Sequence, residues 1–146
     1  FMFLDADDEL ASYAITFYLE KFNNTDGLIA PIHSFTTQRP QFVDLDRVRV
    51  EYFNAKGNIN SFLRKQSACN IIFRTAIVKA HHIRFNENLN TYVDWSFVLE
   101  YMKYVNKFVR IFNFPFYFRG EVYDPFETLT LSEQNFDILF IMNVSH

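Results

Sequence analysis

Four acidic residues crowd the start of the chain, in the stretch "FMFLDADDEL". On an extended segment residues two apart point the same way, so the carboxylates of Asp5 and Asp7 can converge on one ligand. Two hard oxygen donors at the carboxyl end of a strand suit Mg²⁺ or Mn²⁺, which also bind phosphate oxygens. The same residues allow a second interpretation, in which Asp7 or Asp8 caps the following helix, where a carboxylate is favoured.

Other residue types that carry chemistry have simpler interpretations. His81 and His82 are adjacent, so on a helix their side chains diverge by about 100° and do not share a metal. Cys69 has no CxxC partner, which favours a small buried residue over a nucleophile. Arg119 ends an aromatic segment, where its guanidinium could reach a donor phosphate or form a surface salt bridge.

Strand-like patterns must position these side chains. Phe1–Leu4 is short and apolar, and Pro31 indicates an edge or a bulge in the strand predicted over Leu28–Phe35. The alternation of Gln41–Phe53 slips between Leu45 and Val48, which predicts a bulge or a strand in two pieces. The remaining predicted strands are 68–74 and an aromatic one over 107–119, in which Phe108, Phe112, Phe114, Phe116 and Phe118 share one parity.

Helical spacing predicts four helices between these strands. They are 10–22, 57–66, 75–80 and 93–105, the last with Trp95, Val98, Leu99 and Met102 on one face. Mixed strands and helices over residues 1–146 predict a single α/β domain, with a mixed sheet flanked by helices. We expect the parity-matched phenylalanines to pack in the core rather than to form an interface.

Composition narrows the classes of function. The chain is 49% hydrophobic, which is enough to build a core, and its net charge of −3 without a basic stripe argues against nucleic acid as a partner. A single cysteine fits a reducing compartment, and no apolar run reaches the roughly 18 residues that span a bilayer. These features favour a cytoplasmic protein. The first residue, Phe1, already lies in a strand-like run, so we expect a fragment of a longer polypeptide.

Three segments, in order, resemble family-two glycosyltransferases of the GT-A type. "FLDADDEL" is similar to their strand and metal motif, "NIIFRTAIVKAHHIRFNENLNTYVDWSFVLEYM" to their acceptor-side block, and "FPFYFRGEVYDPFETLTLSEQ" to the aromatic strand and tail that follow. The resemblance spans nearly the whole chain and implies a portion of the GT-A fold. Within the family it extends to bacterial cell-wall polymer enzymes, including the amino-terminal domain of teichoic acid glycerol-phosphate polymerases.

The resemblance also implies roles for individual residues. Asp5 contacts the nucleotide part of the donor, Asp7 holds Mn²⁺ or Mg²⁺, and Asp94 is the catalytic base of an inverting transfer. The implied partners are a nucleotide-linked donor, a glycan or polyol-phosphate acceptor, the rest of a longer polypeptide and the inner face of the cell membrane. From its position alone, Asp94 could equally cap the helix that begins beside it.

Some family features differ or are missing. Val93 stands where the family usually has a first acid before Asp94, and the Gln-x-x-Arg-Trp motif of processive synthases is absent. The nucleotide-binding strands that precede the metal motif in the family are not in this chain. These departures leave open a non-catalytic GT-A-like module that serves assembly or acceptor docking. A phosphoryl-transfer enzyme fits Asp-x-Asp but lacks a glycine-rich phosphate loop.

Overall fold

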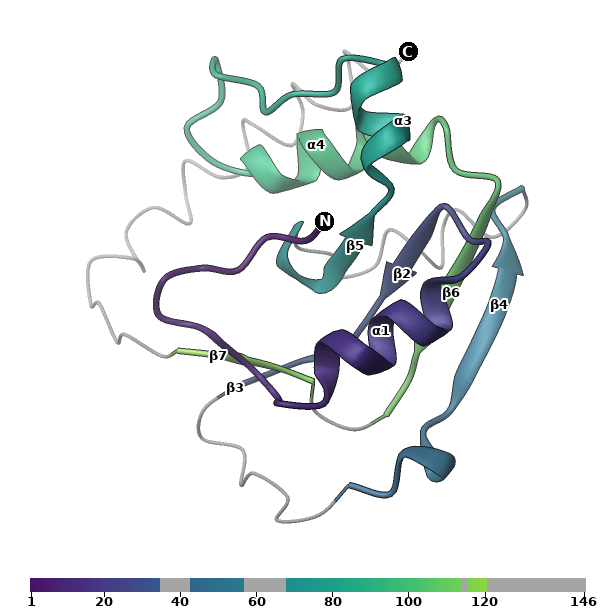
Figure 1. Cartoon of the computed structure of the whole chain (residues 1–146). Coiled ribbons are helices and arrows are strands. Elements are labelled where there is room, and N and C mark those ends of the chain that lie inside the picture. The colour runs from purple at the N-terminus through teal and green to yellow at the C-terminus, as the bar shows by residue number, and fades with distance from the viewer. Residues whose placement is uncertain (35–42, 57–67, 114–115, 121–146) are drawn as a thin grey trace.

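The computed structural model describes residues 1–34, 43–56, 68–113 and 116–120. Within these ranges the strands form two sheets, shown in Figure 1. The larger sheet has the order β4-β6-β2-β5, and the smaller one has the order β1-β7-β3. Mixed sheets with helices confirm the predicted α/β class.

The larger sheet combines one parallel and two antiparallel pairings. Strands β2 (Gly27–Ile29) and β6 (Lys107–Ile111) run parallel at its centre. Strand β4 (Val50–Asn54) is antiparallel to β6, and β5 (Ile71–Phe73) is antiparallel to β2. Every residue of β2 is buried, and β6 is buried at Phe108, Val109 and Ile111.

The smaller sheet continues from the carboxyl ends of the two central strands. Strand β3 (Ile32–Ser34) follows β2, and β7 (Tyr117–Arg119) follows β6. These strands pair in parallel, while β1 (Glu9–Leu10) pairs with β7 in the antiparallel sense. The acidic stretch before β1 is thereby brought to β7, across more than a hundred residues of chain.

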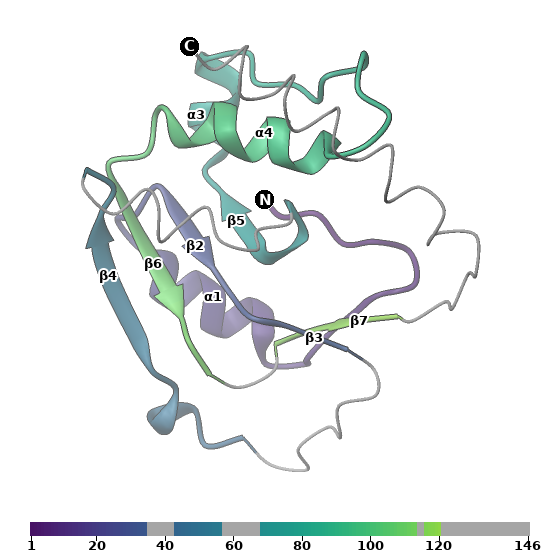
Figure 2. The same cartoon turned by 180° about the vertical axis from the view of Figure 1, so that it is seen from behind.

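Helices cover the two faces of the larger sheet, as Figures 1 and 2 show from opposite sides. Helix α1 (Ala14–Phe22) packs on one face, and α3 (Thr75–Ala80) and α4 (Val93–Met102) lie on the other. Two short 3₁₀ helices, η1 (Leu45–Arg47) and η2 (Ala68–Asn70), precede β4 and β5. No helix in the described ranges is both long and apolar enough to cross a membrane.

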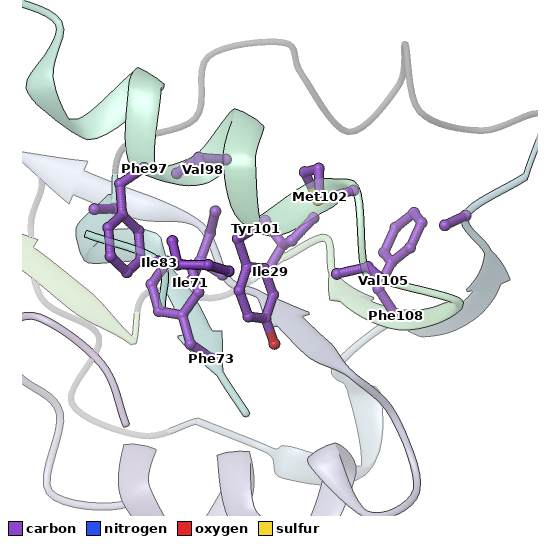
Figure 3. Close-up of a cluster of buried hydrophobic side chains, with 12 residues drawn as sticks. Ile29, Ile71, Phe73, Ile83, Phe97, Val98, Tyr101, Met102, Val105 and Phe108 are labelled. Atoms are coloured by element: carbon purple, nitrogen blue, oxygen red, sulfur yellow. The ribbon is translucent and has the colours of Figure 1, made fainter. Parts of the chain in front are cut away.

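The core beneath α4 is rich in aromatic rings (Figure 3). The Phe73 ring meets the Phe97 ring edge-on at 5.2 Å between centroids and the Tyr101 ring edge-on at 4.9 Å. Edge-to-face pairs of this kind add to the stabilisation from area burial, by about 1 kcal/mol each. The face of α4 that supplies Phe97 and Tyr101 is thereby fixed against β5.

Several predicted boundaries are wrong for local reasons. The predicted strand at residues 1–4 is not regular, although Phe1 and Phe73 exchange two backbone hydrogen bonds of 2.8 Å. The first helix begins at Ala14 rather than Leu10, because Leu10 pairs with Tyr117 in β1. The strand predicted over 28–35 ends at Ile29 and resumes at Ile32, on either side of Pro31.

The predicted aromatic strand also divides, because β6 and β7 lie in different sheets. Phe108, Phe116 and Phe118 are buried as predicted, whereas Phe112 is 37% exposed. The slip of alternation before β4 corresponds to η1, and residues 43–49 contain no strand, so neither the bulge nor the two-piece strand is found among the described residues. Helix 75–80 is confirmed, the last helix is confirmed over 93–102, and Phe114 and the helix predicted over 57–66 lie outside the described residues.

Candidate functional site

The acidic stretch forms a tight turn rather than the extended segment predicted from its spacing. The amide of Asp8 donates a hydrogen bond of 3.0 Å to the carbonyl oxygen of Asp5, which closes the turn. The side chains of Asp5 and Asp7 are exposed, while Asp8 is only 8% exposed. Two of the three aspartates are therefore available to a ligand, and the third is part of the interior.

Asp8 fastens the turn to β7. Its carboxylate accepts a hydrogen bond from the hydroxyl of Tyr117 and a second, of 2.7 Å, from the amide of Gly120. The Tyr117 hydroxyl also lies 3.4 Å from the Asp5 amide, which donates to it. Hydrogen bonds to a buried carboxylate are among the stronger ones in proteins, so this contact fixes where Asp5 and Asp7 lie.

Asp8 does not cap α1 by its side chain, because the helix begins after Tyr13, without a side-chain cap. The capping alternative for Asp7 and Asp8 is therefore wrong.

The backbone of Gly120 lies directly against Asp7. A methyl group at this position would overlap the Asp7 carbonyl oxygen and lie 3.0 Å from its carbonyl carbon. Only a residue without a Cβ permits such a close approach. Gly120 therefore holds the Asp7 backbone against the end of β7.

The Tyr117 hydroxyl is kept in its neutral, donating form. Burial raises the pKa of Tyr117 above its ordinary value, and the hydrogen bonds to Asp8 and Cys69 raise this pKa further. The hydroxyl thus remains a donor to Asp8 over the whole physiological pH range. Cys69 is buried, as the sequence predicted.

Asp94 lies in the first turn of α4 and makes a tertiary contact. The residue that caps this helix is Tyr92, in the left-handed conformation with φ 53°, and it gives no side-chain cap. One Asp94 carboxylate oxygen instead accepts a hydrogen bond of 3.1 Å from the amide of Ala68 in η2. The cap interpretation is therefore wrong in detail, although the predicted helix start is right.

A short path of contacts joins the two acidic regions. Ala68, which donates to Asp94, is followed in the chain by Cys69, which contacts the Tyr117 hydroxyl. That hydroxyl donates to Asp8 in the acidic turn. The structure thus brings Asp94 to the same end of the larger sheet as Asp5 and Asp7, as a shared site requires.

Arg119 is the last residue of β7, and its side chain is exposed next to Gly120. Among the described residues it forms no ion pair, so the surface salt bridge considered from the sequence is not found there.

His81 stacks on the ring of Tyr104, with 3.5 Å between the ring centroids, which agrees with its interpretation as a helix-end residue. In the described ranges no three His, Cys, Asp or Glu side chains gather closely enough to hold a metal by themselves.

Sequence reasoning missed three residues of this site: Asp8 as a fastening group, Tyr117 and Gly120. The weak signal for them was the sequence after the aromatic run, where one of only three glycines in the chain follows Arg119. Nothing in the local pattern separates Asp8 from its acidic neighbours, because its partners are 109 and 112 residues away.

Comparisons of the sequence and of the structure with known proteins both find proteins similar to this chain. No family model matches the sequence. The sequence is 99% identical over 140 residues to a teichoic acid poly(glycerol phosphate) polymerase of Staphylococcus epidermidis, a match that covers 96% of this chain. The chain spans only 19% of the length of that relative.

Solved structures that are similar to this chain include those of S. aureus TarS. TarS 1-349 in complex with UDP superposes with a TM-score of 0.65 at 17% identity, covering 99% of this chain and 39% of that one. The complex with UDP-GlcNAc gives a TM-score of 0.62 at 18% identity, covering 84% and 35%. The chain therefore has the GT-A-like fold of the TarS structures, as its resemblance to GT-A glycosyltransferases predicted, and it matches a segment of a teichoic acid poly(glycerol phosphate) polymerase.

Proposed function

We propose that this chain is a glycosyltransferase domain that transfers a sugar from a nucleotide diphosphate donor during teichoic acid synthesis at the inner face of the cell membrane. The observation that carries the proposal is the acidic turn, whose exposed carboxylates of Asp5 and Asp7 are held in place by the buried Asp8. The fold of TarS, solved with UDP and UDP-GlcNAc, and the name of the polymerase relative support it.

The exposed carboxylates fit a divalent cation that is bound together with the donor. Mg²⁺ is usually held by one or two carboxylates, with substrate phosphates and water completing its shell. Asp7 is assigned as the cation ligand and Asp5 as a contact to the nucleotide portion of the donor. The cation supplies charge neutralisation for the leaving diphosphate. Arg119, exposed beside the turn, is assigned to a donor phosphate, which its guanidinium can bind with two hydrogen bonds.

Asp94 is assigned as the base. Its carboxylate accepts the proton of the acceptor hydroxyl as that oxygen bonds to the anomeric carbon, while the bond from this carbon to the diphosphate breaks. A single displacement of this kind inverts the anomeric centre. One Asp94 oxygen accepts a hydrogen bond from the Ala68 amide, and this contact orients the carboxylate.

Calorimetric titration of UDP-GlcNAc with and without Mn²⁺, on the full-length protein, tests the donor site. The expected result is Mn²⁺-dependent binding that Asp7→Ala abolishes and Asp46→Ala, an exposed acid in η1, leaves unchanged. Asp94→Asn is expected to keep donor binding and to lower the transfer rate by about 10²-fold or more. Equal donor binding by the parent protein and Asp7→Ala would refute the metal assignment.

One observation favours a second candidate, a non-catalytic GT-A-like module that serves assembly or acceptor docking. Asp94 follows Val93 rather than an acid, and its carboxylate already has a structural partner in Ala68. In this alternative Asp94→Asn lowers the free energy of unfolding but changes no transfer rate. Absence of sugar transfer by a folded, full-length protein, with loss of polymerase assembly when this domain is deleted, would favour the module.

A further inference from the structure

Two adjoining hollows lie at the amino end of β6, away from the acidic turn. Their volumes are about 590 Å³ and about 360 Å³, and both are lined by Asn54 and Lys107. These two residues pair in the register of β4 and β6, so the hollows share a wall of sheet backbone. The acidic turn is fastened to β7, beyond the carboxyl end of β6, so the hollows are separate from the proposed donor site.

The linings of the hollows are basic and amide-rich. Their described residues include three lysines and four asparagines, and no aspartate or glutamate, in a chain whose 17 acids outnumber its 14 lysines and arginines. The residues in question are Lys56, Lys103, Lys107, Asn23, Asn24, Asn54 and Asn106. Ammonium groups attract phosphate, and amide groups donate to and accept from hydroxyls, so this lining suits a phosphorylated polyol.

The carboxylates beside the hollows already have partners. One Asp26 oxygen accepts hydrogen bonds from the amides of Asn106, at 2.8 Å, and Lys107, at 3.1 Å. Glu100 pairs with Lys103. In the described part of the chain, Lys56 and Lys107 have no ion-pair partner, so their charge is available to an anion.

The walls are fixed by backbone hydrogen bonds. The Ala55 amide donates to the Asn106 carbonyl at 2.8 Å, and the Asp26 amide donates to the Lys107 carbonyl at 2.7 Å. A site whose backbone is held in this way loses little freedom on binding, which favours affinity. The lysine side chains extend from a preformed surface.

We propose that these hollows bind phosphates of a polyol-phosphate chain of the poly(glycerol phosphate) type, at a distance from the reacting end. The identity of this polymer rests on the proposed function. A polymer that contacts both the hollows and the acidic turn has a raised effective concentration at the turn, so a remote contact favours long acceptors over short ones. Among the described lining residues there is no arginine, the side chain best suited to nucleic-acid recognition, and this favours a polyol phosphate over RNA.

Binding of a glycerol-phosphate oligomer to the full-length protein, measured by calorimetry at several salt concentrations, tests the proposal. The Lys56→Gln/Lys107→Gln double variant is expected to bind at least tenfold more weakly, with a shallower salt dependence because fewer counterions are released. The matched control is Lys79→Gln/Arg84→Gln, which removes two charges from exposed residues outside both linings and is expected to bind like the parent. Equal binding by the double variant and the control would overturn the proposal.

Three competitors identify the ligand. Inorganic phosphate, phosphatidylglycerol vesicles and single-stranded RNA are expected to displace the oligomer only weakly. Tighter binding of vesicles or RNA than of the oligomer, lost in the Lys56/Lys107 variant, would overturn the assignment to a polyol phosphate. Binding of inorganic phosphate as tight as that of the oligomer would overturn the role of the repeated chain.

A donor titration on the same variant separates this proposal from the proposed function. UDP-GlcNAc binding is expected to be unchanged in Lys56→Gln/Lys107→Gln, because neither lysine belongs to the acidic turn. If the parent protein binds the oligomer through these lysines but binds no donor, the glycosyltransferase assignment fails and the polymer site stands. If it binds donor normally but the oligomer is insensitive to the two lysines, the polymer site fails alone.

Discussion

Two turns, at opposite ends of the central strands, can be compared directly. In the turn beside β7, Asp8 is buried and its carboxylate accepts hydrogen bonds from the Tyr117 hydroxyl and the Gly120 amide. In the turn that precedes β2, the half-buried Asp26 carboxylate accepts hydrogen bonds from two backbone amides. The backbone carbonyl oxygen of Asp26 accepts one from the Tyr101 hydroxyl. In each turn an aspartate and a fully buried tyrosine bind distant segments together.

The surfaces that the two turns present have opposite charge. The first exposes Asp5 and Asp7, whereas the second lies between the lysine-lined hollows and the guanidinium of Arg74. Arg74 donates hydrogen bonds of 2.9 Å to the carbonyl oxygens of Thr25 and Asn23, at the carboxyl end of α1. A cation is favoured at that end of a helix.

The acidic turn thus contains one buried acid that holds it in place and two exposed acids. Both carboxylate oxygens of Asp8 accept hydrogen bonds from the protein, whereas the side chains of Asp5 and Asp7 are exposed. Removal of a buried acid leaves its hydrogen-bond donors unpaired, whereas water replaces a more exposed acid, so substitutions in the two turns should differ in effect.

Removal of the Asp8 carboxylate should change the free energy of unfolding more than the other substitutions, and removal of the Asp26 carboxylate should change it much less. Asp8→Ala leaves a buried hydroxyl and the Gly120 amide unpaired, which should lower the free energy of unfolding by about 4 kcal/mol. Asp26→Ala should cost about 1 kcal/mol, because water can reach the amides that it frees. Urea unfolding followed by circular dichroism measures both; equal losses would mean that the difference in burial is unimportant.

Adding a methyl group to a glycine should distinguish the same two regions. Gly120→Ala forces the Asp7 backbone away, so we expect a loss of about 2–3 kcal/mol in stability and loss of Mn²⁺-dependent donor binding. Gly27→Ala is the matched control, since its methyl group would meet the Ile72 carbonyl at 3.8 Å and a Tyr101 ring carbon at 3.9 Å, which are ordinary contacts. Retained donor binding in Gly120→Ala would show that the position of Asp7 tolerates movement.

The Tyr101 hydroxyl should make stability depend on pH in the alkaline range. Burial raises the pKa of Tyr101 to about 12, above the ordinary value of 10. Between these values the unfolded chain loses the proton while the folded chain keeps it, so the free energy of unfolding falls as pH rises. For Tyr101 this fall is on the order of 2 kcal/mol from pH 10 to 12.

Tyr101→Phe tests this assignment, because it removes one titrating group from the turn at β2. The variant should lose less stability between pH 10 and 12 than the parent, in urea unfolding series at each pH. It should keep a residual dependence, because burial raises the pKa of Tyr117 in the same direction. An identical pH dependence in variant and parent would mean that Tyr101 does not titrate in this range.

Elements with a strong local signal were predictable from the sequence. The helix at 93–102 has apolar residues at helical spacing, and α3 follows a short apolar strand, so both helices were placed correctly. The predicted face of α4 was only half right, because Phe97 and Tyr101 are buried whereas Trp95 and Leu99 are half-buried. The prediction of one aromatic strand was wrong, because phenylalanines that alternate in the same phase belong to two strands, β6 and β7, in different sheets. Phe108 packs beneath α4 and Phe116 beneath α1, so one parity serves two cores.

The candidate site likewise contains residues that could be predicted from the sequence and residues that could not. The candidates Asp5, Asp7 and Asp94 came from local motifs and a family resemblance, and the structure brings these residues to one end of the larger sheet. Their roles remain predictions. The burial of Asp8 could not be predicted, because the local sequence does not distinguish the three aspartates. Only the distant Tyr117 hydroxyl, which donates to Asp8, makes it different.

The smallest expected effect concerns a third buried tyrosine, which lacks the kind of partner that Tyr101 and Tyr117 have. Tyr18 of α1 is 3% exposed, and within the described residues its hydroxyl has no hydrogen-bond partner. A buried, unpaired hydroxyl costs stability, so Tyr18→Phe should raise the free energy of unfolding by about 1 kcal/mol. Tyr117→Phe, which instead removes a donor from buried Asp8, should lower it, and urea unfolding compares the two. A loss of stability in both variants would mean that the Tyr18 hydroxyl has a partner and that all three tyrosines serve as fasteners.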